Sequence, residues 1–141
     1  MSIASILAPL FAQILLVAIL SIVLGKRRAD AVKAGLVKMG PAVTGDASAW
    51  PKQATLASNS FNNQFQFPVL FYVLTILALI TKKADMAFVV MAWVFVASRY
   101  VHAFIHVTTN RMPGRFYAFI VGVTVLVVMW IIFAFRILAS G

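Results

Sequence analysis

The fold follows from one stretch of the chain, residues 86–107, which reads MAFVVMAWVFVASRYVHAFIHV. It is long enough to cross a membrane as an α-helix, because a span needs about 20 mostly apolar residues. Arg99 lies within it, at a depth where a charge costs at least a few kcal/mol unless it faces protein or water. An arginine at this depth therefore indicates a functional site as well as a membrane span.

Further polar residues share a helix face with Arg99. At 100° per residue, four positions fall at about 0°, 300°, 340° and 20°; they are Arg99, His102, His106 and Asn110. Arg115 follows just past the end of the span. The spacing predicts a narrow polar stripe along one side of this helix.

The composition is that of an all-α integral membrane protein. Of the 141 residues, 63% are hydrophobic and only 11% are charged, which leaves too few polar residues to cover a soluble fold. Twelve basic residues oppose three acidic ones, most of them beside apolar segments, so we expect membrane lipids as partners and no nucleic acid. The chain has no cysteine, which excludes a protein thiolate nucleophile and a cysteine metal site.

We expect a single membrane domain, residues 1–141, built as a bundle of four transmembrane helices. The apolar segments predict helices at about 3–24, 59–81, 86–107 and 116–138, with a long loop at about 25–58. The first segment is expected to be retained and not cleaved as a signal peptide, because nothing basic precedes it and a basic cluster follows it. Pro68 should bend the second helix by releasing the carbonyl of Gln64 from its usual bond.

The connections between these helices predict the topology. Most basic residues lie in the first and third connections, so the positive-inside rule places those connections in the cytoplasm and both termini outside. Arg28 to Lys38 can continue the first helix past the membrane, until Gly40, Pro41 and Gly45 break it. The second connection, residues 82–85, is so short that helices two and three should form an antiparallel hairpin.

The second helix carries a polar stripe of its own. Its amides are spaced i, i+3, i+4, i+7 and fall within about 100° of arc; they are Asn59, Asn62, Asn63 and Gln66. Both stripes belong to the cytoplasmic half of the membrane, so we expect them to form a polar pocket open to the cytoplasm. Since no acidic residue in the membrane neutralises Arg99, the pocket should bind a carboxylate or phosphate.

The same residues allow plainer interpretations. The amides could simply hydrogen-bond across helix interfaces, and Arg99 could extend toward headgroups. His102 and His106, spaced i, i+4, could ligate a metal, but no Asp, Glu or Cys lies near as a third ligand. We therefore predict no metal site and two neutral histidines that donate hydrogen bonds.

The spacing R-x2-H-x3-[Y/H]-x8-R, here Arg99, His102, His106 and Arg115, resembles the third-helix signature of the MAPEG family, the membrane-associated proteins in eicosanoid and glutathione metabolism. The segment NSFNNQFQFPVLFY, residues 59–72, is similar to the family's second-helix pattern. The likeness covers almost the whole chain and is strongest from Asn59 to Phe119.

This resemblance implies a homotrimer that binds glutathione near the cytoplasmic side, between neighbouring subunits. Arg99 and His102 would bind glutathione, His106 would stand where the family usually has Tyr, and Arg115 would be the catalytic residue that stabilises the thiolate. The amides of the second helix would join the binding residues. The family's second-helix Glu is replaced by Gln66, or by Gln64 in another register, and no arginine precedes the asparagines. Phe116 stands where the prostaglandin-synthase branch has Ser, so that isomerase activity is not expected.

Three functions remain open at this point. The first is a glutathione-dependent transferase or peroxidase that acts on lipophilic electrophiles or lipid hydroperoxides. The second is a non-catalytic membrane protein that binds an anionic lipid or a partner in the same pocket. The third, a channel or transporter, is disfavoured because the polar residues are confined to one half of the membrane.

Overall fold

A computed structural model describes all 141 residues, and the chain is helical throughout, without strands. The elements are α1 (Ile3–Lys33), α2 (Met39–Val43), a 3-10 turn η1 (Ala47–Ala49), α3 (Lys52–Asn63), α4 (Phe67–Ile80), α5 (Met86–Val107) and α6 (Gly114–Ala139). Four stretches are long and apolar enough to cross a membrane, with α3 and α4 together forming the second. The predicted four-helix membrane fold is confirmed.

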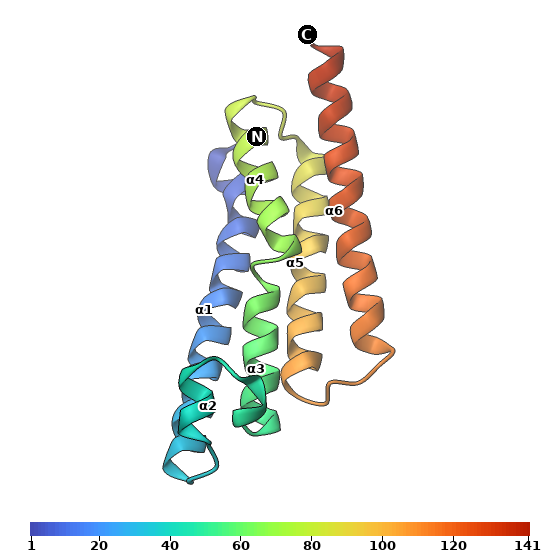
Figure 1. The fold of residues 1–141 in the computed structure, drawn as a ribbon. Coiled ribbons are helices and arrows are strands. Elements are labelled where there is room, and N and C mark those ends of the chain that lie inside the picture. Colours follow the sequence, from blue (N-terminus) through green and yellow to red (C-terminus); the bar gives the residue numbers. More distant parts are fainter.

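The four spans run in alternating directions (Figure 1). Both termini lie at one end of the bundle, and α2 lies at the other end, beyond the spans. The first connection is therefore on the same side as the turn between α5 and α6, as the sequence indicates.

The first helix continues past Leu24 to Lys33, so the predicted extension beyond the membrane is present but stops short of Lys38. Its last turns are polar, and Lys26 Nζ lies 2.8 Å from the Asp30 carboxylate, an i,i+4 pair that suits an exposed helix. Two residues past the end of the helix, Gly35 turns the chain away with a φ of +70°, the left-handed conformation that glycine adopts freely. Gly40 and Pro41 do not end the first helix as expected. They lie in the first turn of α2, where proline's missing N–H is not needed.

The second span is broken where only a bend was expected. α3 begins at Lys52, earlier than the predicted start at Asn59, and ends at Asn63, and α4 begins at Phe67. Pro68 sits in the first turn of α4 and has no N–H to bond the carbonyl of Gln64. That carbonyl accepts instead from the hydroxyl of Tyr72, at 3.4 Å. The predicted release of the Gln64 carbonyl is thus observed, and its result is a new helix start.

The third span agrees with its predicted bounds, residues 86–107. It begins at Asp85, whose Oδ1 accepts from the N–H of Phe88 at 2.9 Å and caps the helix. At its other end, Arg27 from α1 donates to the carbonyl of Val107 at 2.7 Å. α6 begins at Gly114, two residues before the predicted start, and ends at Ala139, one residue past the predicted end.

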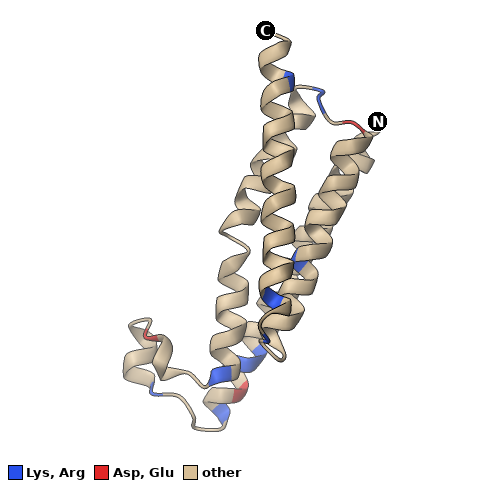
Figure 2. Cartoon of the chain, turned by 90° about the vertical axis from the view of Figure 1, so that its right-hand side faces the viewer, with Lys and Arg blue, Asp and Glu red and all other residues tan.

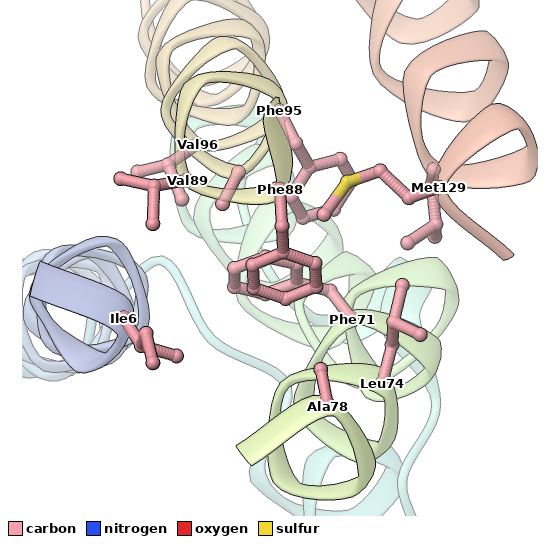
Figure 3. Packing of buried hydrophobic residues seen from close by; sticks show 11 residues of the cluster. Ile6, Phe71, Leu74, Ala78, Phe88, Val89, Phe95, Val96 and Met129 are labelled. Carbon is pink, nitrogen blue, oxygen red and sulfur yellow. The ribbon is translucent and has the colours of Figure 1, made fainter. Parts of the chain in front are cut away.

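The core lies around α5, and all four spans contribute side chains to it (Figure 3). Phe71 from α4 and Phe95 from α5 stack with ring centroids 4.8 Å apart and are almost fully buried. Met129 from α6 and Ile6 from α1 approach this pair from either side. The core thus fixes α5, the helix that carries Arg99, between α1 and α6.

Charged residues lie mainly at the two ends of the bundle (Figure 2). Basic residues gather at the end that carries α2, and the acidic residues also lie near the ends. At the opposite end, Arg136 Nη2 lies 2.6 Å from the Asp85 carboxylate. This distribution leaves Arg99, which is only 2% exposed, as a charge deep among the helices.

Candidate anion-binding site

Arg99 is held by a neutral partner. Its Nη2 donates to Oδ1 of Asn63, the last residue of α3, and its Nε is buried without any hydrogen-bond partner. The predicted meeting of the two stripes therefore occurs at one pair of residues, Arg99 and Asn63. A guanidinium carries donors only, so it fixes the oxygen of the Asn63 amide toward itself.

The other end of the Asn63 amide faces away from Arg99. Its Nδ2 donates to Oε1 of Gln66 at 3.1 Å, which uses one of its two N–H bonds and leaves the second free. Asn63 also lines a cavity of about 280 Å³, whereas Arg99 does not. Arg99 thus acts on this cavity from behind Asn63, whose N–H groups it polarises.

The cavity lies between α5, the α5–α6 turn and the first turns of α6. Its other lining residues are His102, His106, Met112, Arg115, Phe116 and Phe119. His102 and His106 are 5% and 8% exposed, their ring centroids are 5.6 Å apart, and the Nδ1 atom of each is buried without a partner. Nε of Arg99, behind the cavity wall, is also buried without a partner, and unpaired buried polar atoms of this kind are uncommon in folded proteins.

Arg115 brings a second guanidinium to the cavity. It is partly buried in the first turn of α6, and its Nη1 donates to Oδ1 of Asn110 at 2.5 Å. Asn110 lies outside α5, in a turn with φ of +50°, because the helix ends at Val107. The prediction that Asn110 extends the helical stripe was wrong, and its role is to orient Arg115.

No carboxylate neutralises either arginine. The chain's three acidic residues all have partners elsewhere: Asp30 pairs with Lys26, Asp85 with Arg136, and Asp46 accepts from Ser48. The hydroxyl and the backbone N–H of Ser48 hold the pKa of the Asp46 carboxyl below its ordinary value. The two site arginines therefore meet only amide oxygens, which leaves their charge available to an anion.

The remaining amides of the second span do not join Arg99. Asn59 and Asn62 are exposed and line a separate cavity of about 300 Å³ beside Arg28 and Trp50. Gln66 is exposed beyond the end of α3, so it does not continue a single helical stripe. The expectation that all four amides face the Arg99 stripe was wrong: Asn59 and Asn62 face the other cavity, and Gln66 reaches Arg99 only through its bond to Asn63.

Some residues of the site were not anticipated. Met112 and Phe119 line the cavity. Their only sequence signal is that they lie within four residues of the motif residue Arg115. No group of three or more His, Cys, Asp or Glu side chains comes together in the structure.

These features define the class of protein: an integral membrane bundle of four spans with a cationic cavity near one end. The chain belongs to the MAPEG family, whose sequence model matches residues 6–135. The resemblance drawn from the Arg99–Arg115 spacing is thereby confirmed. Comparisons with curated proteins and with solved structures found no match.

Proposed function

We propose that this protein is a glutathione-dependent transferase or peroxidase that acts on lipophilic electrophiles or lipid hydroperoxides. One observation carries the proposal: Arg115 lines the cavity, Arg99 lies behind its wall residue Asn63, and the only side-chain hydrogen bond of each guanidinium goes to an asparagine oxygen. Family membership supports it, because the family's name joins its members to glutathione metabolism.

The residues at the cavity fit glutathione, a tripeptide with two carboxylates and a thiol. Arg115, His102 and His106 would contact it directly, and Asn63 would donate to a carboxylate with an N–H polarised by Arg99. Hydrogen bonds from charged donors to carboxylates are about twice as strong as neutral ones. The buried atoms without partners, Nε of Arg99 and Nδ1 of both histidines, support the same assignment.

Arg115 is the proposed catalytic residue. When bound, glutathione would supply the nucleophile: its sulfur forms a bond to an electrophilic carbon while the leaving group departs and the thiol proton goes to solvent. In the peroxidase reaction two glutathione thiols would reduce one hydroperoxide to an alcohol and water and become joined as the disulfide. A free thiol has a pKa of about 8.5, and a guanidinium beside it favours the thiolate at neutral pH. A guanidinium acts here through its positive charge, so the proposal needs no general base.

The lipophilic substrate would approach along an apolar groove. Gln66, Phe67, Leu70 and Phe119 line a second hollow between α4 and α6, and Phe119 borders both this hollow and the cationic cavity. Phe67, Leu70 and Phe116 are exposed on the outside of the bundle. A substrate dissolved in the bilayer can therefore reach the thiol without leaving the apolar phase.

We propose further that the protein acts as a homotrimer with the ligand between subunits. Asn59, Asn62 and Gln66 are exposed amides near one end of a membrane span, where contact with lipid is unfavourable. A neighbouring subunit would cover them, and their donors would complete the binding site. We also propose that the first and third connections face the cytoplasm, where glutathione is available.

Turnover of 1-chloro-2,4-dinitrobenzene with glutathione tests the catalytic proposal. We expect measurable turnover by the purified protein, and a fall in kcat of at least about tenfold in Arg115→Ala, with a smaller change in KM. Arg111→Ala is the matched control, because Arg111 is exposed on the same turn and does not line the cavity. Equal rates in wild type and Arg115→Ala would remove Arg115 from the mechanism.

A second function is favoured by one observation, the neutral Gln66 in place of the family's expected carboxylate. The same cavity could hold the headgroup of an anionic lipid and perform no chemistry. In that case the purified protein would retain an anionic phospholipid, detected by mass spectrometry, and would show no turnover. Saturable glutathione binding that is lost in Arg99→Ala would count against this alternative.

A further inference from the structure

Two glutamines form a buried pair deep in the bundle, behind the site. Nε2 of Gln13 in α1 donates to Oε1 of Gln64 at 2.9 Å, and both side chains are 0% exposed. Oε1 of Gln13 has no partner. A polar pair in an apolar interior adds little or no net stability over apolar residues of similar size, so its value lies in fixing one arrangement.

Gln64 fixes the break between α3 and α4. Its side chain donates to the carbonyl of Ser60 at 3.0 Å while it accepts from Gln13, and its own carbonyl accepts from Tyr72. The side chain is thus bonded at both its nitrogen and its oxygen, so it cannot rotate without breaking a bond. Asn63, which holds Arg99, directly precedes it in the chain.

A second hydrogen bond holds the chain beside Arg99 to the same part of α1. The hydroxyl of Tyr100 donates to the carbonyl of Ala12 at 2.6 Å, and Tyr100 directly follows Arg99. Two consecutive residues of α1 therefore bond the chain on both sides of the site: Gln13 bonds Gln64, which follows Asn63, and Ala12 bonds Tyr100, which follows Arg99.

We propose that Gln13, together with the carbonyl of Ala12, positions the Asn63–Arg99 pair for ligand binding. α1 sets the rotation of the α3–α4 break through Gln64 and the rotation of α5 through Tyr100. Gln13 is a positioning residue, since it does not line the cavity and acts only through Gln64 and Asn63. This inference rests on the proposed function for its ligand, but it concerns a geometry that can be observed without one.

The first readout is the geometry of Arg99 itself. Nitrogen-15 NMR of the protein in detergent micelles should show resolved guanidinium N–H signals for Arg99, assigned by their loss in Arg99→Lys, because a buried, bonded guanidinium exchanges slowly. Gln13→Met, which keeps the volume and removes the donor, should broaden or shift these signals. Thr75→Val is the matched control, since Thr75 is equally buried and its hydroxyl bonds only within α4; it should leave them unchanged.

The second readout is glutathione affinity measured by calorimetry. Gln13→Met should weaken glutathione binding by about tenfold. When Gln13→Met is added to the variant Asn63→Ala, it should weaken binding by less than about twofold further, because the effect of Gln13 passes through Asn63. A merely structural role predicts the same loss in both backgrounds. The double variant Gln13→Met with Gln64→Met leaves no unpaired amide, so it should melt near the wild-type temperature and still bind weakly.

The outcomes separate this inference from the proposed function. If the wild type binds no glutathione, the proposed function fails, and the NMR signals of Arg99 alone decide the positioning role. If the wild type binds glutathione and Gln13→Met changes neither the affinity nor the Arg99 signals, the positioning role is overturned and the proposed function stands.

Discussion

Asn63 is the residue through which the buried charge of Arg99 reaches the cavity. It accepts from Arg99 with its oxygen and donates one N–H to Gln66, which leaves its second N–H free for the proposed ligand. An aspartate at this position would neutralise Arg99 and offer no donor. The neutral amide therefore leaves the site cationic at the expense of an ion pair.

The variant Asn63→Asp tests this account of the residue. We expect glutathione affinity to fall by at least about tenfold, because the new carboxylate neutralises Arg99 and repels the carboxylates of the ligand. The melting temperature should be unchanged or higher, because the aspartate gives the buried guanidinium an opposite charge. Calorimetry and thermal unfolding measure the two quantities, and undiminished affinity in a folded protein would refute the role of Asn63.

At this scale, helical periodicity is enough to place Arg99, His102 and His106 on one buried face. It fails for Asn110, because α5 ends at Val107 and the following turn has its own geometry. The Gln13–Gln64 pair lies beyond sequence reasoning, since no local pattern relates two residues 51 positions apart.

At the scale of the elements, Gly122 of α6 lies close against Ser98 of α5. A Cβ atom at this position would lie 2.6 Å from Oγ of Ser98, which is itself bonded to the carbonyl of Phe95 at 2.6 Å. The next nearest atoms would be at ordinary contact distance, 3.6 Å and beyond. The small residues Gly122 and Ser98 therefore set the separation of the two helices.

Gly122→Ala should destabilise the protein by about 1–3 kcal/mol, because the added methyl group forces the Ser98 hydroxyl out of its bond or the helices apart. Ser98→Ala removes the clashing oxygen, so the double variant should recover most of that loss. Unfolding in mixed micelles measures the difference. A double variant as unstable as Gly122→Ala alone would show that the close approach is not the cause.

The start of α5 carries an ion pair that gives stability a dependence on pH. The hydrogen bond from Arg136, and then the N–H of Phe88, hold the pKa of the Asp85 carboxyl below its ordinary value of 3.8. The ionised form is favoured in the folded state, so this contribution is complete well above pH 3.8 and is lost as the pH falls through the lowered pKa.

Asp85→Asn keeps an N-cap and removes the charge. At pH 7 it should cost at most about 1 kcal/mol, because both side chains are about a third to a half exposed and water screens the pair. The difference from wild type should shrink as the pH falls below 3.8. Thermal unfolding across pH checks this, and a constant difference would exclude the ion pair as its source.

The elements also show where sequence reasoning stops. Pro68 predicts a disturbed helix, but whether the chain bends or restarts depends on the bonds that Gln64 finds in α1 and α3. Pro51, directly before the first residue of α3, is a local signal of a helix start. Because the first turn of α3 is polar, a search for apolar segments places the start of the helix too late.

On the scale of the whole molecule, the four-helix membrane fold follows from composition and segment length alone. Its termini share one end, and the first and third connections share the other (Figure 1). Which of these ends faces the cytoplasm stays a prediction of the positive-inside rule. The proposed trimer, and the proposed contribution of the exposed amides to a neighbour's site, concern contacts between chains, which the structure of one chain does not test.

The absence of native cysteine allows the orientation to be tested directly. Val43→Cys, in the α2 connection, should react with a membrane-impermeant maleimide only after the cytoplasmic side is opened. Gly141→Cys should react in intact cells. The opposite labelling pattern would invert the topology and place the cationic cavity outside the cytoplasm.

The account as a whole depends on an anion with carboxylates binding beside Arg99 and Arg115. Titration calorimetry of the purified protein with glutathione and with its dimethyl ester, in which both carboxylates are neutral, tests this most directly. We predict saturable binding of glutathione and affinity for the ester weaker by at least about tenfold. Equal affinity for the two ligands, or no binding of glutathione, would contradict the account.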